Sequence, residues 1–141
     1  MFEVVKYESK HMDMLIEQEA TAYLRPYMTK KHADALENTM AYTGIYSGKV
    51  IVCAGVVEYW ANRGEAWALL DAQCRKEFIF IHNVIRRFLN ICPLRRVEAA
   101  VDLNFEAGHR WVKALGFKLE APLLRAYRQD GGDCSLYARV R

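Results

Sequence analysis

The sequence predicts an α+β fold: a mixed, mostly antiparallel central sheet with helices on both faces. Apolar runs of strand length alternate with segments whose apolar residues recur at helical spacing, in the order β-α-α-β-β-β-α-β-α-β-β. The three consecutive strands, joined by short turns, favour antiparallel pairing, and the helix after them favours a crossover to a parallel neighbour. With 141 residues, 52% of them hydrophobic and 26% charged, the chain is expected to form one domain over residues 1–141.

The first predicted strand is Phe2–Tyr7. Ser9 is expected to cap the first helix, which Pro26 limits, because proline cannot continue a helix. Thr29 is expected to cap a second helix that continues to about Thr39.

Three strands follow in segments 42–48, 49–60 and 64–72, with turns at Ser47-Gly48 and at Asn62-Arg63-Gly64. A long helix comes next and ends before Pro93. One face of this helix carries five apolar residues at helical spacing: Phe78, Ile81, Ile85, Phe88 and Leu89.

The last third predicts a strand at Arg96–Asp102 and a helix from about Phe105 to Leu115, with Gly116 as its left-handed C-cap. The turn "DGGD" is expected to join a final pair of strands, residues 118–129 and 134–140.

The segment "NFEAGHRWVKALGFKLE", Asn104–Glu120, joins a polar start, a short amphipathic helix and a Leu-Gly-Phe stop to a strand. With the preceding "VEAAVD" and the element order, it resembles the GNAT (GCN5-related N-acetyltransferase) superfamily. The resemblance covers the whole chain in element order and is specific from about Gly64 to Glu120. Small acetyltransferase-like proteins encoded by tailed phages look similarly short.

The resemblance implies an N-acetyltransferase that moves an acetyl group from acetyl-CoA to an amine acceptor in a ternary complex. The strands "AWALLD" and "VEAAVD" would lie parallel and splay apart, so that free backbone groups bind the amide-rich pantetheine arm as a pseudo-strand. The N-terminus of the long helix would offer N–H groups to the pyrophosphate. The resemblance places binding of the co-substrate on Leu69, Leu70, Asp71, Arg75, Lys76, Glu77, Phe78 and Asn104.

The resemblance also implies a carboxylate on the central strands as general base, and Glu58 and Glu65 are the candidates. The alternative for both is a solvated glutamate beside a turn. Asn104 could equally cap the helix that follows it. No metal is expected.

Two positions depart from the family pattern. The family's phosphate loop reads Arg/Gln-x-x-Gly-x-Gly/Ala, but Phe78 and Phe80 occupy the glycine places here, which suggests a reshaped loop or a lost site. The tyrosine that often serves as general acid is replaced by Val112 or Trp111, depending on the alignment. The alternative function is therefore a catalytically degenerate GNAT-fold binding or assembly protein of phage type, which would expose an apolar patch or form a homodimer.

Other reactive residues have structural alternatives. Cys74 lies near a helix N-terminus and could carry an acyl group, although no base partner is evident. His82 is expected to be solvated or packed, whereas His109 lies closer to the expected site but is expected in a surface role. Three aromatic residues would wall an acceptor pocket if they lay at a sheet edge, but we expect them in the core: Tyr59, Trp60 and Trp67.

The net charge of +3 is too small to indicate nucleic-acid binding, and the basic residues near Arg86-Arg87 and Leu94–Arg96 favour a solvated face. The four cysteines form no C-x-x-C pair, and the N-terminus lacks the basic start and apolar core of a signal peptide. No apolar run approaches the ~20 residues that span a bilayer. We therefore expect a cytoplasmic protein with free thiols and no membrane segment.

Overall fold

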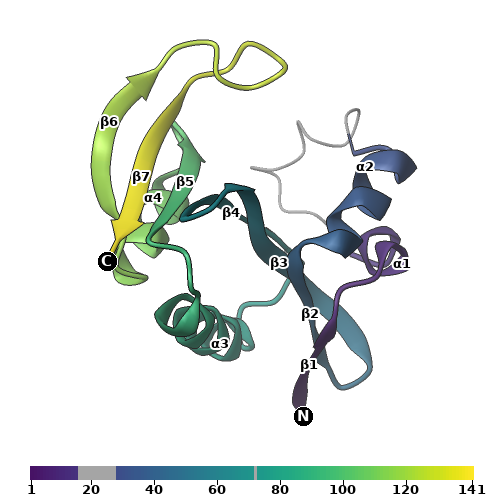
Figure 1. Cartoon of the computed structure of the whole chain (residues 1–141). Helices are drawn as coiled ribbons and strands as arrows, with labels where there is room; N and C mark the ends of the chain where they lie inside the picture. The colour runs from purple at the N-terminus through teal and green to yellow at the C-terminus, as the bar shows by residue number, and fades with distance from the viewer. Residues whose placement is uncertain (16–27, 72) are drawn as a thin grey trace. The chain divides into compact units, whose positions relative to one another are not determined.

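The computed structural model describes residues 1–15, 28–71 and 73–141. Seven strands form one mixed sheet in the order β1-β2-β3-β4-β5-β7-β6 (Figure 1). The strands are β1 (Phe2–Lys6), β2 (Met40–Tyr46), β3 (Lys49–Trp60), β4 (Arg63–Leu70), β5 (Arg96–Asp102), β6 (Lys118–Leu124) and β7 (Cys134–Val140). The helices are α1 (Ser9–Asp13), α2 (Lys30–Ala35) with the 3₁₀ turn η2 (Leu36–Asn38), α3 (Phe78–Ile91) and α4 (Glu106–Ala114). The predicted fold class and element order are confirmed.

The chain divides into two compact units, which are described separately. The first unit comprises Met1–Val57 and Trp67–Ile91, and the second comprises Glu58–Ala66 and Cys92–Arg141. The expectation of a single domain over residues 1–141 stays a prediction.

In the first unit, helices cover both faces of β2, because its side chains alternate between the two faces. Tyr42 lies 5.9 Å from Phe88 of α3, measured between ring centroids, whereas Thr43 hydrogen-bonds His11 of α1 at 2.8 Å. Figure 1 accordingly shows α1 and α2 on one side of β2 and β3, and α3 on the other. Tyr7 anchors the α1 and α2 side, because its hydroxyl donates to the carbonyl of Ala33 at 3.0 Å.

In the second unit, β5 pairs with β4 in parallel and with β7 in antiparallel orientation. The β4–β5 ladder has three pairs, which join Arg63–Glu65 to Arg96–Glu98. Helix α4 covers one face of β5, since Val101 lies under Gly108 at a distance that leaves no room for a Cβ without displacement. The intervening residues, Glu98 and Asp102 among them, therefore point to the face opposite α4.

Three of the differences between the predicted and observed element boundaries have an identifiable cause. Glu8, not Ser9, is the N-cap of α1, and its N–H is bound by the Nδ1 atom of His11 at 3.0 Å. Phe105, not Asn104, caps α4, and its carbonyl accepts the N–H of His109 at 3.1 Å. The part of the first predicted helix that falls in residues 16–27 lies outside the described residues.

The third difference is at the end of the chain, where β6 stops at Leu124 instead of Gln129. Ala126 adopts a left-handed conformation, with φ at 52°, and its N–H is held by the carboxylate of Asp133 at 2.8 Å. A strand cannot continue through this turn. Gly116 does have the predicted left-handed conformation, with φ at 95°.

Candidate functional site

The end of β4 and the turn after it are fixed by a buried aspartate. The side chain of Asp71 is 1% exposed and accepts the Lys49 ammonium at 2.6 Å and the N–H of Gln73 at 2.9 Å. Burial acts to raise the pKa of Asp71, but these two donors outweigh it and hold the pKa below its ordinary value. Leu69 and Leu70 are buried as well. Their side chains and the Asp71 carboxylate therefore serve packing and the turn, which leaves only backbone groups of this segment for a ligand.

Charged residues stand immediately before α3. Arg75 and Lys76 are exposed, and the carbonyl of Glu77 accepts the N–H groups of Phe80 and Ile81 at 3.0 and 3.3 Å. The helix therefore begins with two exposed cations, which have no ion pair within the described residues, and with a set of N–H groups that precede the first intrahelical bonds. Such an N-terminus attracts an anion.

The two phenylalanines at the family's glycine places belong to α3 itself. The Phe80 ring is stacked at 5.8 Å on Phe2 of β1 and at 5.9 Å on Tyr46 of β2. The Phe78 ring lies 6.4 Å from His82, one turn further along the helix. Both rings therefore pack along the sides of the helix, and Phe80 attaches α3 to the sheet.

Cys74 lies in the turn before α3 but is 6% exposed. Burial raises the pKa of its thiol, and the charge of Asp71 adds to the rise. A helix N-terminus can lower a thiol pKa, and the opposite is found here. The hypothesis of an acyl-carrying Cys74 therefore loses its chemical basis.

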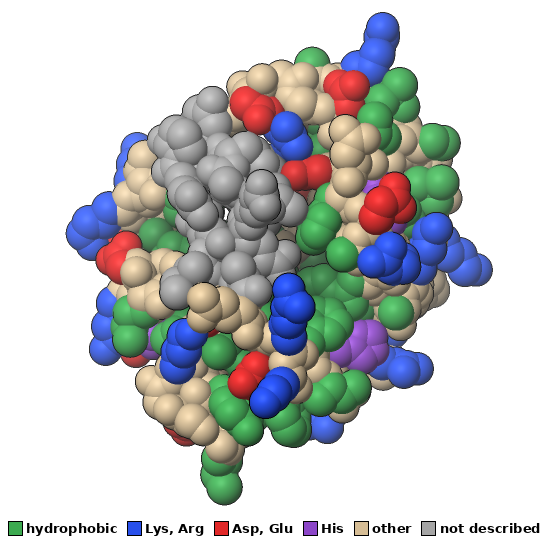
Figure 2. Space-filling view, turned by 180° about the vertical axis from the view of Figure 1, so that it is seen from behind, with side chains coloured by type: hydrophobic (Ala, Val, Ile, Leu, Met, Phe, Trp, Pro, Cys, Tyr) green, Lys and Arg blue, Asp and Glu red, His purple; other side chains and the backbone are tan. Residues whose placement is uncertain are grey.

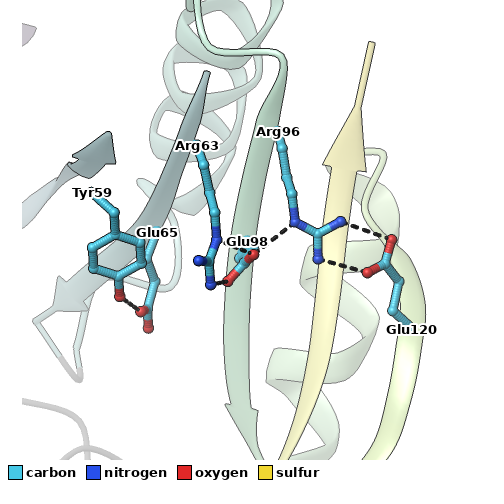
Figure 3. Close-up of polar contacts among 6 residues, drawn as sticks. All are labelled: Tyr59, Arg63, Glu65, Arg96, Glu98 and Glu120. Atoms are coloured by element: carbon cyan, nitrogen blue, oxygen red, sulfur yellow. Dashed lines mark hydrogen bonds and ion pairs between the residues drawn. The ribbon is translucent and has the colours of Figure 1, made fainter. Parts of the chain in front are cut away.

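In the second unit, the two glutamates proposed as general base have different surroundings. Glu58 is exposed, whereas Glu65 is partly buried and accepts a hydrogen bond from the hydroxyl of Tyr59 (Figure 3). Burial is the larger cause, and the bond to Glu65 the second, of a strongly raised pKa for Tyr59. At neutral pH the phenol therefore keeps its proton and donates a hydrogen bond to the carboxylate.

Beside Tyr59 and Glu65 runs a row of four alternating charges: Arg63, Glu98, Arg96 and Glu120. Glu98 is 4% exposed and receives Arg63 Nε at 2.7 Å and Arg96 Nε at 2.7 Å. Arg96 also donates two bonds to Glu120, the shorter at 2.6 Å. Figure 3 shows the row crossing from β4 over β5 and β7 to β6. The charges of these four side chains balance one another.

The expectation that Tyr59 and Trp60 lie in the core is wrong, because they are 46% and 61% exposed. The Arg63 guanidinium lies over both rings, at 5.2 Å from the Tyr59 centroid and 4.7 Å from the Trp60 centroid. Cation–π contacts therefore hold these aromatic residues at the surface. Trp67 is partly buried and packs edge-on against Tyr7, as expected of a core residue.

The residues of the second unit near α4 offer no clear general acid. Val112 is buried, and its carbonyl accepts the N–H of Phe117 at 3.0 Å. His109 bonds the Tyr137 hydroxyl at 2.8 Å and the carbonyl of Leu103 at 2.9 Å, so both ring nitrogens are occupied. The carbonyl requires an N–H at Nε2, and Nδ1 therefore accepts from Tyr137. His109 is thus a partly buried structural link. Asn104 is exposed after the end of β5.

Sequence reasoning missed four residues of the second unit that organise this region. Arg63 and Glu98 form the centre of the charged row, and Tyr127 and Arg128 lie in the loop between β6 and β7. Arg128 bridges Asp102 at 2.9 Å and Asp130 at 3.0 Å, which ties that loop to the end of β5. The polar residues at alternate positions of β4 and β5 were a usable signal, because they mark the face opposite α4.

The predicted site residues therefore fall into two groups. Leu69, Leu70, Asp71, Arg75, Lys76, Glu77 and Phe78 belong to the first unit, whereas Glu58, Glu65 and Asn104 belong to the second. On the face that Figure 2 shows, Lys and Arg side chains stand among acidic and apolar ones. None of the described helices is long and apolar enough to cross a membrane.

No family model matches the chain, and no curated protein matches it in sequence. Solved structures do match. The Ard1 protein of Thermoplasma volcanium has a TM-score of 0.81 at 17% identity, covering 99% of this chain and 97% of its own. A GNAT-family acetyltransferase from Bacillus anthracis gives 0.70 at 14%, covering 99% and 94%. RimL, a ribosomal L7/L12 α-N-protein acetyltransferase solved with coenzyme A, gives 0.76 at 14%, covering 99% and 93%. The chain therefore has the GNAT fold.

Proposed function

We propose that the protein is an N-acyltransferase that transfers an acetyl group from acetyl-CoA to an amine. The observation that supports this most is the match of 99% of the chain to GNAT acetyltransferase structures, one of them solved with coenzyme A. Identities of 13–17% leave the acceptor open.

Acetyl-CoA would be held by the first unit. Arg75, Lys76 and the N–H groups at the start of α3 are suited to its pyrophosphate, because they combine two cations with a helix N-terminus. The rings of Phe78 and Phe80 pack along α3, so a phenylalanine at a glycine place does not by itself exclude an anion. Backbone groups of Leu69–Asp71 would bind the amide-rich pantetheine arm.

The reaction joins the acceptor nitrogen to the carbonyl carbon of the thioester. Glu58 or Glu65 would assist removal of the proton from the nitrogen, directly or through water. Backbone N–H groups near Leu70 would polarise the carbonyl. The C–N bond forms, the C–S bond breaks, and the thiolate leaves with the bonding electrons. The leaving thiolate would take its proton from water, because Trp111 and Val112 cannot supply one.

Calorimetric titration with acetyl-CoA, and with CoA alongside, tests the proposal. We expect micromolar dissociation constants that rise about tenfold or more in the Arg75→Ala/Lys76→Ala variant, since two charged contacts to phosphate are lost. The matched control is Arg86→Ala/Arg87→Ala, which removes the same charge from exposed positions within α3 and should change affinity about twofold or less.

The absence of binding at millimolar acetyl-CoA would overturn the proposal. It would favour the second function, a GNAT-fold binding or assembly protein that acts through protein contacts. The specific observation behind that alternative is the loss of both loop glycines and of the acid tyrosine.

A further inference from the structure

His11 is the only buried residue among the four histidines of the chain, with 6% of its surface exposed. It belongs to α1 and turns towards β2, where its Nδ1 atom lies 2.8 Å from the hydroxyl of Thr43. Thr43 itself is fully buried. The ring of Tyr7 packs edge-on against the imidazole, at 6.3 Å between ring centroids. The imidazole therefore fastens α1 to the sheet from a position that water hardly reaches.

The hydrogen bonds at Nδ1 fix the protonation state of this ring. The N–H of Glu8, the N-cap of α1, donates to Nδ1 at 3.0 Å. A backbone N–H can only donate, so Nδ1 carries no proton and the proton of the neutral ring lies on Nε2. The Thr43 hydroxyl then donates to Nδ1 as well, and its oxygen can accept from the thiol of Cys53 at 3.8 Å. The observed docking of α1 therefore requires a neutral His11.

A second proton on the ring has to enter at Nδ1, and there it meets a donor that cannot turn round. The Thr43 hydroxyl can rotate and accept from a protonated Nδ1, because a hydroxyl serves as donor or acceptor. The Glu8 N–H cannot reverse its role, so two N–H groups would point at each other across the present 3.0 Å. Protonation therefore breaks the bond that closes the N-terminus of α1 and leaves one of its first N–H groups unsatisfied.

The charges around the ring do not make up for that loss. His11 has no ion pair within the described residues. The Glu8 carboxylate is paired with Lys10 at 3.7 Å, and the Glu37 carboxylate accepts the N–H of Ser9 at 2.6 Å. The titratable and charged groups of the elements around His11 are Glu8 and Lys10 on α1, Tyr7 after β1, Cys53 on β3, Asp34 on α2 and Glu37 on η2.

Two of these groups carry no charge near neutral pH, because the pKa of Tyr7 is raised to about 12 and that of Cys53 to about 11. Burial is the largest influence on His11 and lowers its pKa below the ordinary value of 6.5. The charge of Lys10 acts in the same direction, whereas Glu8 and Glu37 oppose it without reversing the result. The neutral ring that the hydrogen bonds require is therefore also the form that the surroundings favour.

We propose that His11 is an acid-sensitive latch, whose protonation at Nδ1 releases α1 from β2. The released ring is exposed and takes up a proton with a pKa of about 6.5, whereas the docked ring does so only at lower pH. Docking is therefore at full strength above about pH 6.5 and weakens as the pH falls towards the lowered pKa of the docked ring. This inference goes beyond the proposed acetyl transfer and does not depend on it, since every contact involved lies in the first unit.

The first measurements need no variant. In the wild type at pH 7.5, ¹⁵N NMR of the imidazole should show a bare Nδ1 and a protonated Nε2. The amides of His11 and Leu15, which bond the carbonyls of Glu8 and Met12 at 2.9 and 3.3 Å, report on the docking of α1. Their hydrogen exchange, corrected for the intrinsic rate, should speed up by as much as about tenfold between pH 7.5 and 5.5.

A reference amide separates release of α1 from loss of the whole unit. The N–H of Asp71 bonds the carbonyl of Ile51 at 2.8 Å within the first unit, and its corrected exchange should stay constant over the same pH range. An equal acceleration at Asp71 would overturn the proposal, because the acid effect would then be global. A protonated Nδ1 at pH 7.5 would overturn it as well, as would a ring that gains its proton while the Leu15 amide stays protected.

The decisive variant is His11→Asn, which offers an amide oxygen near the place of Nδ1 and does not titrate. We expect the exchange of Leu15 in this variant to change less than about twofold between pH 7.5 and 5.5. The matched control is His32→Asn, which removes an exposed histidine from α2 and should keep the wild-type response. A full acid response in His11→Asn, or its loss in His32→Asn, would show that another group is the sensor.

Discussion

Glu98 holds two arginines from adjacent strands, and its removal gives the sharpest test of the charged row. The Glu98→Gln change keeps the size of the side chain but removes the charge that Arg63 and Arg96 share. Breaking a buried ion pair on one side costs about 3–5 kcal/mol. The two arginine side chains are 35% and 30% exposed, so water recovers part of that loss. We expect the free energy of unfolding to fall by about 2–3 kcal/mol, or the melting temperature by roughly 6–9 °C for a chain of this length.

The matched control is Glu120→Gln, because Glu120 pairs with the same Arg96 but its side chain is 41% exposed. Its melting temperature should change far less. Urea and thermal unfolding of the two variants and the wild type, at pH 7, give the comparison. If Glu98→Gln is no more destabilising than Glu120→Gln, then the buried position of Glu98 carries no special energy and the reasoning is refuted.

The ion pairs of Glu98 with Arg63 and Arg96 also predict that the stability of the protein depends on pH. The hydrogen bond from Arg63, with that from Arg96, holds the pKa of Glu98 below its ordinary value of 4.5 in spite of burial. A lowered folded-state pKa stabilises the protein fully above the unfolded value and is lost as the pH falls through the folded value. The stability gap between wild type and Glu98→Gln should therefore be constant near neutral pH and narrow below about 4.5. A gap that widens on acidification would contradict this assignment.

Three further outcomes follow from the packing. Cys74→Ala should leave acetyl transfer unchanged. Ellman's reagent should label the four cysteines only after denaturation, since all four are buried. Rapid labelling of the native protein would contradict this. Gly55→Ala should destabilise the protein by about 2 kcal/mol or more, because a Cβ there would collide with the backbone of Met40 and Ala41. Gly131→Ala should cost only about 1 kcal/mol, for its φ of 86°. Equal melting temperatures of the two variants would refute this difference. Arg128→Met should speed hydrogen exchange at the amide of Ala126, because the loop loses its bridge to Asp102. Unchanged exchange would show that this bridge does not hold the loop.

The fold was predictable because its signals are local. The strand and helix periods, the Thr29 cap and the left-handed Gly116 each depend on a few neighbouring residues, and each is confirmed. Two of the boundaries that failed depend on particular side-chain contacts, which the strand and helix periods do not show. The early end of β6 is set by contacts of the loop with Asp133, and the cap at Glu8 by the ring of His11.

The charged row could not be predicted from the sequence, because its residues are far apart in the chain. Arg63, Glu98 and Glu120 come from three strands, and only the sheet order brings them together. A sequence shows that each is polar, but not which strand lies beside which. The exposed position of Trp60 was missed because an aromatic residue near a hairpin end is stabilised here by an arginine three residues later, a cross-strand contact that composition does not reveal.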